Sequence, residues 1–303
     1  MKAETMTRLA KPMLMFAALI WGTSFFIMKN TLDALPVFWL LACRFTVGAV
    51  LLGLFCLPKW KRFNLQYLLR GAVLGVLLFA AYGVQTFGLV YTTPSNNAFL
   101  TATYCVLVPF LYWLVAGQRP DGYNIAAALL CITGVGLVSL TGNLTLSPGD
   151  ALTLLCALFY ALHIVAVNKL AVGYDIYLLT AIQFAGVALC SFVGGLLFQP
   201  FPAGVFTDPE VVFPLLYLCV MATTVALLFQ NVGQVWSDPS SASVILSLES
   251  VFGVLFSVLL YGDPITGRLL LGFGLIFLAV LCSETKLSFL PRRKRSIDSS
   301  VRL

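Results

Sequence analysis

Apolar residues occur along this chain in long runs separated by short polar breaks. A helix that crosses a bilayer needs about 20 predominantly apolar residues, and hydropathy predicts ten such segments in the sequence. They cover residues 13–32, 36–57, 68–90, 96–116, 123–141, 150–170, 176–198, 211–233, 240–261 and 266–282. The breaks contain turn residues such as Thr93-Pro94-Ser95 and Asp238-Pro239-Ser240. We therefore expect an all-α, polytopic membrane protein with ten transmembrane helices.

Composition strengthens this expectation. Of the 303 residues, 60% are hydrophobic and only 10% are charged, whereas a soluble domain has about 25% charged residues. A surface in water would have to expose too many of these side chains, so the bilayer is the natural solvent. The eight cysteines all fall in apolar segments and form no CxxC pair. We interpret them as core-filling residues, and we expect no metal and no cofactor.

The placement of Lys and Arg predicts the orientation. If the spans alternate, the N-terminus and the loops with Lys59, Arg119 and Lys169 lie on one side, together with the tail. Cytoplasmic loops carry this excess of basic residues, so both termini are expected in the cytoplasm of a plasma-membrane protein. Residues 1–12 then form a cytoplasmic N-terminus and 286–303 a basic cytoplasmic tail. Such tails bind anionic lipid; nucleic acid is the alternative ligand, and we expect no nucleic-acid partner.

The two halves of the sequence, 13–142 and 149–285, are related by an internal repeat. At an offset of 145 the matched pairs are Gln85 with Gln230, Gly88 with Gly233, Pro94 with Pro239, and Gly117 with Gly262. At an offset of 139, Trp21 falls on Tyr160 and Arg44 on Gln183. Each half has five predicted spans, an odd number, so the second half enters the membrane from the opposite side. Secondary transporters use such inverted repeats to alternate access to a central site; a duplication within a scaffold protein is the alternative.

Several of these stretches resemble the EamA family of the drug/metabolite transporter superfamily. The resemblance rests on Trp21-Gly22-Thr23-Ser24 with Lys29, Arg44-Phe45, the turn and helix from Pro94 to Gly117, Leu248-Glu249-Ser250-Val251, and Gly262-Asp263-Pro264. It covers nearly the whole chain. It implies two inverted five-helix repeats and secondary transport of small metabolites, often export of amino acids or related compounds. Ser250 stands where the family often has proline, which removes a possible helix kink.

Three ionisable residues lie deep within predicted spans, where a charge is costly unless it faces a cavity or a partner. Glu249 and Arg44 have nearly the same depth, so an ion pair between them is one reading. Glu249 is a candidate proton carrier or ligand for a substrate ammonium group, or a static carboxylate bonded to other helices. Arg44 either contacts substrate or ties helices together. His163 lies deeper toward the cytoplasm, as a site residue or a packed core histidine.

Aromatic and amide side chains complete the predicted site. Trp21, Tyr82, Tyr104 and Tyr160 lie well inside their spans, unlike the other Trp and Tyr residues, most of which lie near predicted helix ends. Such rings suit an apolar or cationic part of a substrate; ordinary helix packing is the alternative. Gln85 and Gln230 are repeat partners that either bond a substrate or hold helices together.

These features predict a secondary active transporter that moves a small amino acid-like or amphipathic metabolite by alternating access, with export favoured, and Glu249 is the candidate residue for proton coupling. The alternatives are an importer or exchanger of a nucleobase, a sugar or a drug-like cation, or a channel or scaffold. No HExxH or GxSxG motif occurs, and we do not expect an enzyme.

Overall fold

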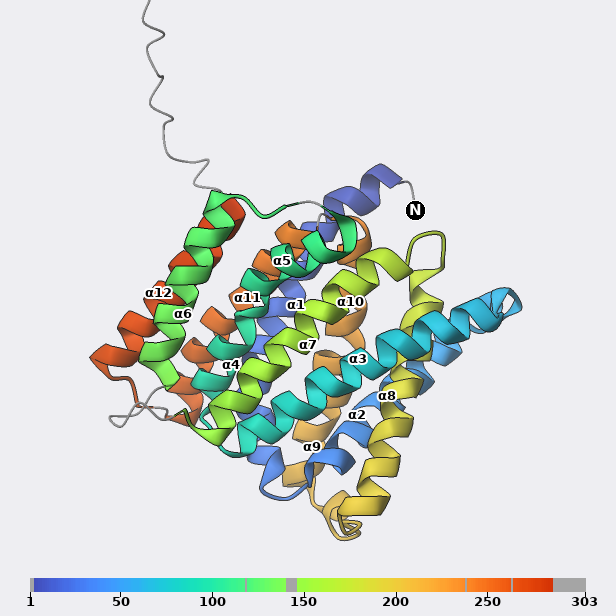
Figure 1. Cartoon of the computed structure of the whole chain (residues 1–303). Helices are drawn as coiled ribbons and strands as arrows, with labels where there is room; N and C mark the ends of the chain where they lie inside the picture. The colour runs from blue at the N-terminus through green and yellow to red at the C-terminus, as the bar shows by residue number, and fades with distance from the viewer. Residues whose placement is uncertain (1–2, 118, 140–145, 238, 263, 286–303) are drawn as a thin grey trace, which may run out of the picture.

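The computed structural model describes residues 3–117, 119–139, 146–237, 239–262 and 264–285. This part of the chain is helical and forms no β-strand (Figure 1). The first half contains α1 (Ala3–Leu32), α2 (Val37–Phe55), η1 (Leu57–Arg62), α3 (Leu65–Val90), α4 (Pro94–Ala102), α5 (Tyr104–Ala116) and α6 (Gly122–Ser139). The second contains α7 (Pro148–Leu170), α8 (Ile176–Phe198), η2 (Val205–Thr207), α9 (Pro209–Tyr217), η3 (Leu218–Val225), α10 (Ala226–Val235), α11 (Pro239–Phe256), η4 (Ser257–Tyr261) and α12 (Gly267–Thr285). The predicted basic tail at 286–303 and Asp238 lie outside the described residues.

The lengths of the helices agree with a membrane-spanning bundle. In the described part of the chain, seven helical segments are long and apolar enough to cross a bilayer, and three shorter apolar helices accompany them. The shorter ones, Gly122–Leu137, Ile245–Tyr261 and Gly267–Ala279, fall on three of the ten predicted segments. The all-α, polytopic class is therefore confirmed, while the count of ten complete spans stays a prediction.

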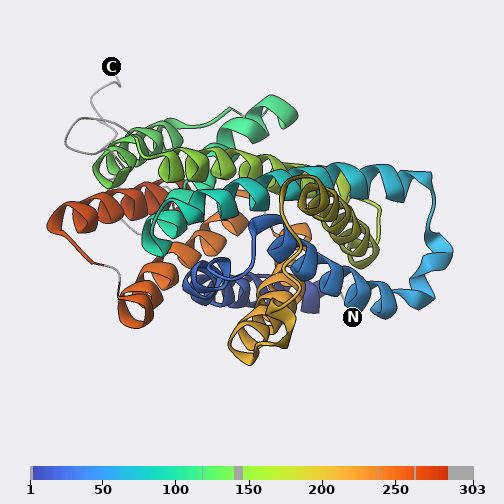
Figure 2. The same cartoon turned by 90° about the horizontal axis from the view of Figure 1, so that it is seen from below.

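Helices from the two halves pack closely against each other. The main contacts are α2 with α8, α3 with α7, and α1 with α10 and α11. Figure 2 shows α6 and α12 together at one edge of the bundle, where they form another close pair. The core between these helices thus receives side chains from both halves of the chain.

The first helix begins well before the apolar run that predicts it. The run starts at Met13, but α1 starts at Ala3. Glu4 and Arg8 form an ion pair of 2.7 Å one turn apart on an exposed face, which favours a helix there. Met6 and Ala10 are buried against the bundle, so these early turns belong to the packed structure.

Three predicted helices contain breaks, and the third of them, the predicted span 240–261, widens into a π-helix at Ser257–Tyr261. Pro109 lacks the amide that would bond to the chain four residues earlier, and the helix tightens around Thr103, whose hydroxyl bonds to Leu100 O at 2.7 Å. The helix of α9, η3 and α10 widens into a π-helical segment at Leu218–Val225. In contrast, α11 runs without a break through Glu249, as expected from a serine instead of a proline at the next position.

Candidate functional site

A small cavity lies in the centre of the bundle, between helices of both halves. Eight of the nine predicted site residues line it: Trp21, Arg44, Tyr82, Gln85, Tyr104, Tyr160, Gln230 and Glu249. The space left between the side chains is about 30 Å³, enough for roughly two water molecules. A metabolite therefore fits only after the surrounding helices move apart.

Arg44 is the cation of the cavity and is held by neutral groups. Its side chain is only 1% exposed. Nε–H donates to Thr223 Oγ1 at 2.8 Å, and the Nη1 group approaches Met28 Sδ at 3.2 Å. The guanidinium lies 5.1 Å from the centre of the Tyr82 ring, within the range of a cation–π interaction. Within the described part of the chain, Arg44 forms no ion pair.

Thr223 reaches Arg44 because of the π-helical segment. In η3 the Thr224 hydroxyl donates to Cys219 O, five residues earlier, at 2.8 Å. A π-helical bulge changes the direction in which side chains leave the helix and is frequent at functional sites. Sequence reasoning missed this residue. The paired hydroxyls of Thr223 and Thr224 inside an apolar segment were the available signal.

Glu249 is the carboxylate of the cavity, on α11, and is 5% exposed. It lines the same cavity as Arg44, yet no ion pair joins the two among the described residues. The hydroxyl of Tyr104 lies beside its carboxyl group, although that hydroxyl makes no hydrogen bond of standard geometry. The similar depth of Arg44 and Glu249 in their helices therefore brings both ionisable side chains to one cavity without an ion pair between them.

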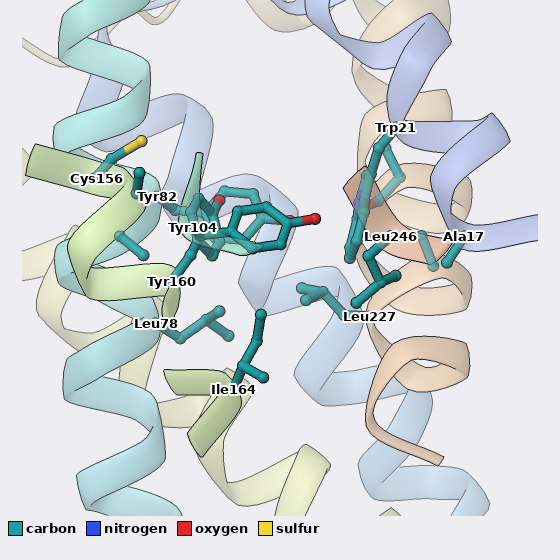
Figure 3. Close-up of a cluster of buried hydrophobic side chains, with 14 of the residues drawn as sticks. Ala17, Trp21, Leu78, Tyr82, Tyr104, Cys156, Tyr160, Ile164, Leu227 and Leu246 are labelled. Atoms are coloured by element: carbon teal, nitrogen blue, oxygen red, sulfur yellow. The ribbon is translucent and has the colours of Figure 1, made fainter. Parts of the chain in front are cut away.

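Aromatic rings form much of the cavity wall. Tyr82, Tyr104 and Tyr160 gather on one side and face Trp21 on the other (Figure 3). The ring centres of Tyr82 and Tyr160 are 5.5 Å apart, and those of Tyr104 and Tyr160 are 6.2 Å apart. Trp21 Nε1–H donates to Ala222 O, in the π-helical segment, at 2.8 Å. This bond fixes the plane of the indole ring against the cavity.

The amides differ in their bonding. Gln85 accepts a hydrogen bond from Tyr160 OH at 2.9 Å and donates to Thr101 Oγ1 at 3.1 Å, so it joins three helices. Gln230 also lines the cavity, but its Oε1 atom is buried without a hydrogen-bond partner in the described structure. His163 is the one predicted site residue that does not line the cavity. It is fully buried between α7 and α8, with Nε2 3.1 Å from Gln183 Oε1.

The described residues contain no group of three or more His, Cys, Asp or Glu side chains placed to hold a metal ion. What the site offers instead is one buried basic group, one buried carboxyl group and five aromatic rings, Trp21, Phe25, Tyr82, Tyr104 and Tyr160, around a small cavity. Together with the polytopic fold, this is the arrangement of a membrane transporter, a class that binds its cargo between helices near the bilayer midplane.

Comparisons with known proteins agree with that class. The profile of the EamA-like transporter family matches residues 9–140 and again 147–285, and the chain belongs to this family. An uncharacterized transporter of Archaeoglobus fulgidus is 35% identical over 88% of this chain and 83% of its own length. The uncharacterized transporter YvbV of Bacillus subtilis is 26% identical over 94% of both chains.

A solved structure titled "Crystal structure of protein" has the same fold. It has a TM-score of 0.71 at 19% identity and covers 92% of this chain and 98% of its own. At this identity the likeness extends to the fold alone. The residues of the cavity are therefore interpreted from their own geometry.

Proposed function

We propose that the protein is a secondary active transporter for a small amino acid-like metabolite, with export as its direction. The observation that carries the proposal is one basic and one acidic side chain that line the same cavity and form no ion pair with each other. Among the described residues, Arg44 is held by neutral groups and Glu249 lies near a neutral hydroxyl. Buried charges are costly unless they are paired, so a ligand with both charges suits this site.

The α-carboxylate of an amino acid is the natural partner for Arg44, since guanidinium groups bind carboxylates through two N–H donors. The ammonium group is the natural partner for Glu249. The rings of Trp21, Tyr82 and Tyr160 then surround the side chain of the ligand, which favours an apolar or aromatic group. A zwitterionic amino acid thus complements the guanidinium group, the carboxyl group and the aromatic rings of the cavity.

Alternating access requires two gates related by the inverted repeat, and two close helix contacts support this. A Cβ atom built on Gly88 would lie 3.0 Å from Gly149 O, and one built on Gly233 would lie 3.1 Å from Ala10 O. The glycines differ by 145 positions and their partners by 139, the two offsets of the sequence repeat. The two contacts are therefore images of one another, at opposite ends of the bundle under the predicted topology.

The membrane and the orientation belong to the same proposal. Exposed Arg119 and Lys169 and partly exposed Lys59 lie in or beside the short connections that the sequence assigns to the cytoplasm. The protein is placed in the plasma membrane with both termini inside, and its basic tail lies against anionic lipid. Export is favoured by the resemblance to metabolite exporters, and a proton carried by Glu249 is proposed as the coupling ion.

Counterflow in proteoliposomes tests the proposal. Vesicles loaded with one unlabelled amino acid should accumulate its labelled form, and a panel of amino acids, nucleobases and polyamines identifies the class. Arg44→Gln should reduce exchange of a zwitterion at least tenfold, since a charged hydrogen bond contributes about 1.5–3 kcal/mol. Arg268→Gln is the matched control, because Arg268 is exposed and away from the cavity. Wild-type protein that exchanges no compound of the panel would refute the proposal.

Glu249 distinguishes the proposed cargo from the main alternative. Aromatic rings with one carboxylate also suit a drug-like cation. For a cation, Glu249→Gln should abolish exchange while Arg44→Gln leaves it intact. For a zwitterion with proton coupling, both Arg44→Gln and Glu249→Gln should reduce exchange, and Glu249→Gln should in addition abolish the response to a pH gradient.

A further inference from the structure

A second group of polar side chains is buried between α7, α8 and α10, outside the central cavity. His163 bonds to Gln183, and one turn along α8 the Thr180 hydroxyl accepts from Asn231 Nδ2 at 3.0 Å. Gln234 lies on the same face of α10, one turn beyond Gln230. All of these side chains are at most 3% exposed. The group is therefore a cluster of buried polar side chains between these three helices.

The cluster is poorly satisfied by the protein itself. Within the described residues, the buried polar atoms without a partner include His163 Nδ1, Gln183 Nε2, Asn231 Oδ1 and both polar atoms of the Gln234 amide. Amides that merely hold helices together make hydrogen bonds across the interface. Buried polar groups left unpaired are rare and costly, and each needs an explanation such as an ordered water or a function. The two hydrogen bonds between helices account for only part of the polar groups in this cluster.

Gln230 connects the cluster to the central cavity. Its side chain lines the cavity, and it is the residue before Asn231 and one turn before Gln234 on α10. Gln234 lies next to the last residue of α10, at the end that the predicted topology assigns to the cytoplasm. The polar groups thus extend from the cavity wall to the end of a helix. The helix α10 itself, through Gln230, Asn231 and Gln234, therefore links the central cavity to the polar cluster.

Apolar side chains close the far end of this path. Val232 packs in a cluster with Met6 of α1 and Val167 and Ile176 of the second half. The contact of Gly233 with α1 lies at the same level. A carrier must keep one side closed while the other is open, and these early turns of α1 form a closure at this end.

We propose that this cluster is the cytoplasmic proton path to Glu249, a hydrated chain of amides and one imidazole that opens when α1 separates from α10. The proposal rests on the proton-coupled transport proposed above. In the path, a proton leaves the Glu249 carboxyl group along hydrogen-bonded waters held by His163, Asn231 and Gln234 and reaches cytoplasmic water, as export driven by proton entry requires, and no other bond changes. Apart from the Gln183 amide, no charged or polar side chain acts directly on the imidazole.

Gln234→Met provides the sharpest test, because neither polar atom of Gln234 has a protein partner to lose. The variant should fold, with a thermal stability equal to or above that of the wild type. Gln85→Met is the matched control for stability, since the Gln85 amide is bonded at both ends, and it should be less stable. His163→Leu gives an independent interruption of the path.

Two measurements on each variant in proteoliposomes separate the outcomes. Gln234→Met and His163→Leu should retain substrate counterflow within about twofold, whereas uptake driven by a pH gradient should fall at least tenfold, a difference of about 1.4 kcal/mol. Unchanged gradient-driven uptake in both variants would overturn the proton path, and so would an equal loss of counterflow and driven uptake. Wild-type protein with counterflow but no response to the gradient would refute proton coupling itself. Absence of counterflow in the wild type would refute the transport function.

Discussion

Removal of the Asp175 carboxylate should weaken the connection between the two halves at the end assigned to the cytoplasm. Asp175 lies in the connection of α7 and α8. Its Oδ2 atom is 2.9 Å from Lys59 Nζ, in the connection of α2 and α3. Its Oδ1 atom also accepts hydrogen bonds from the amides of Tyr177 and Leu178, at 3.0 and 3.3 Å. One side chain therefore caps α8 and joins the halves.

The two roles of Asp175 have different magnitudes. Loss of an N-cap costs about 1 kcal/mol when the residue is replaced by alanine and little when it is replaced by asparagine. The side chains of Lys59 and Asp175 are 29% and 12% exposed, so solvent screens the ion pair and its loss costs about 1 kcal/mol at most. Asp175→Ala should thus lower the free energy of unfolding by about 2 kcal/mol, and Asp175→Asn by no more than about 1 kcal/mol.

Denaturant titration in detergent micelles measures both values. The destabilisation by Asp175→Asn, which reports the ion pair, should become smaller in 1 M salt, where the Debye length falls to about 3 Å. The further destabilisation by Asp175→Ala, which reports the N-cap, should not depend on salt. Arg62→Gln is the control, because Arg62 is 70% exposed and lies 3.8 Å from the same carboxylate; it should have almost no effect. If Asp175→Asn costs as much as Asp175→Ala, the capping role assigned here is wrong.

Three further substitutions test the packing that positions the cavity. Gly149→Ala should destabilise the protein by about 1–3 kcal/mol, because its Cβ would lie 2.6 Å from the carbonyl carbon of Tyr91. Gly53→Ala is the control in the same denaturant titration. A Cβ at Gly53 has nothing within 4 Å, so this variant should be neutral or stabilised. Lys29→Met should cost about 2 kcal/mol, since the ammonium group donates to three carbonyl oxygens beyond and within the end of α3 at 2.7–3.1 Å; a loss below 0.5 kcal/mol would contradict this capping role. Trp21→Phe should lower the free energy of unfolding by about 1 kcal/mol, because it removes the 2.8 Å hydrogen bond of the indole N–H. A variant as stable as the wild type in thermal unfolding would contradict the anchoring of this ring.

The membrane fold follows from the sequence because a bilayer imposes one strong rule on long apolar segments. The same rule predicts a cavity from Arg44 and Glu249, since ionisable side chains within a span are costly unless they face a cavity or a partner. Depth along a helix does not give the direction in which a side chain points. His163 has a suitable depth for a polar site, but it points between α7 and α8 and not into the central cavity.

The local departures from regular helix were harder to predict. The π-helical segment at Leu218–Val225 depends on tertiary contacts, including the bond from Arg44 to Thr223, and no short-range pattern encodes it. The start of α1 was missed for a different reason. Hydropathy counts Glu4 and Arg8 against a helix, although an ion pair one turn apart stabilises it.

The repeat gives each of the two ionisable residues of the cavity a neutral partner in the other half. At an offset of 139 the image of Arg44 is Gln183, and at an offset of 145 the image of Glu249 is Tyr104. Each charged residue thus has a neutral polar partner in the other half, so the symmetric frame holds one cation and one anion. A second copy of either charged group would repel the first in the same buried cavity. One basic and one acidic side chain in such pairs complement the zwitterionic cargo proposed above, and the uncharged Gln183 suits the proposed proton path beside the cavity.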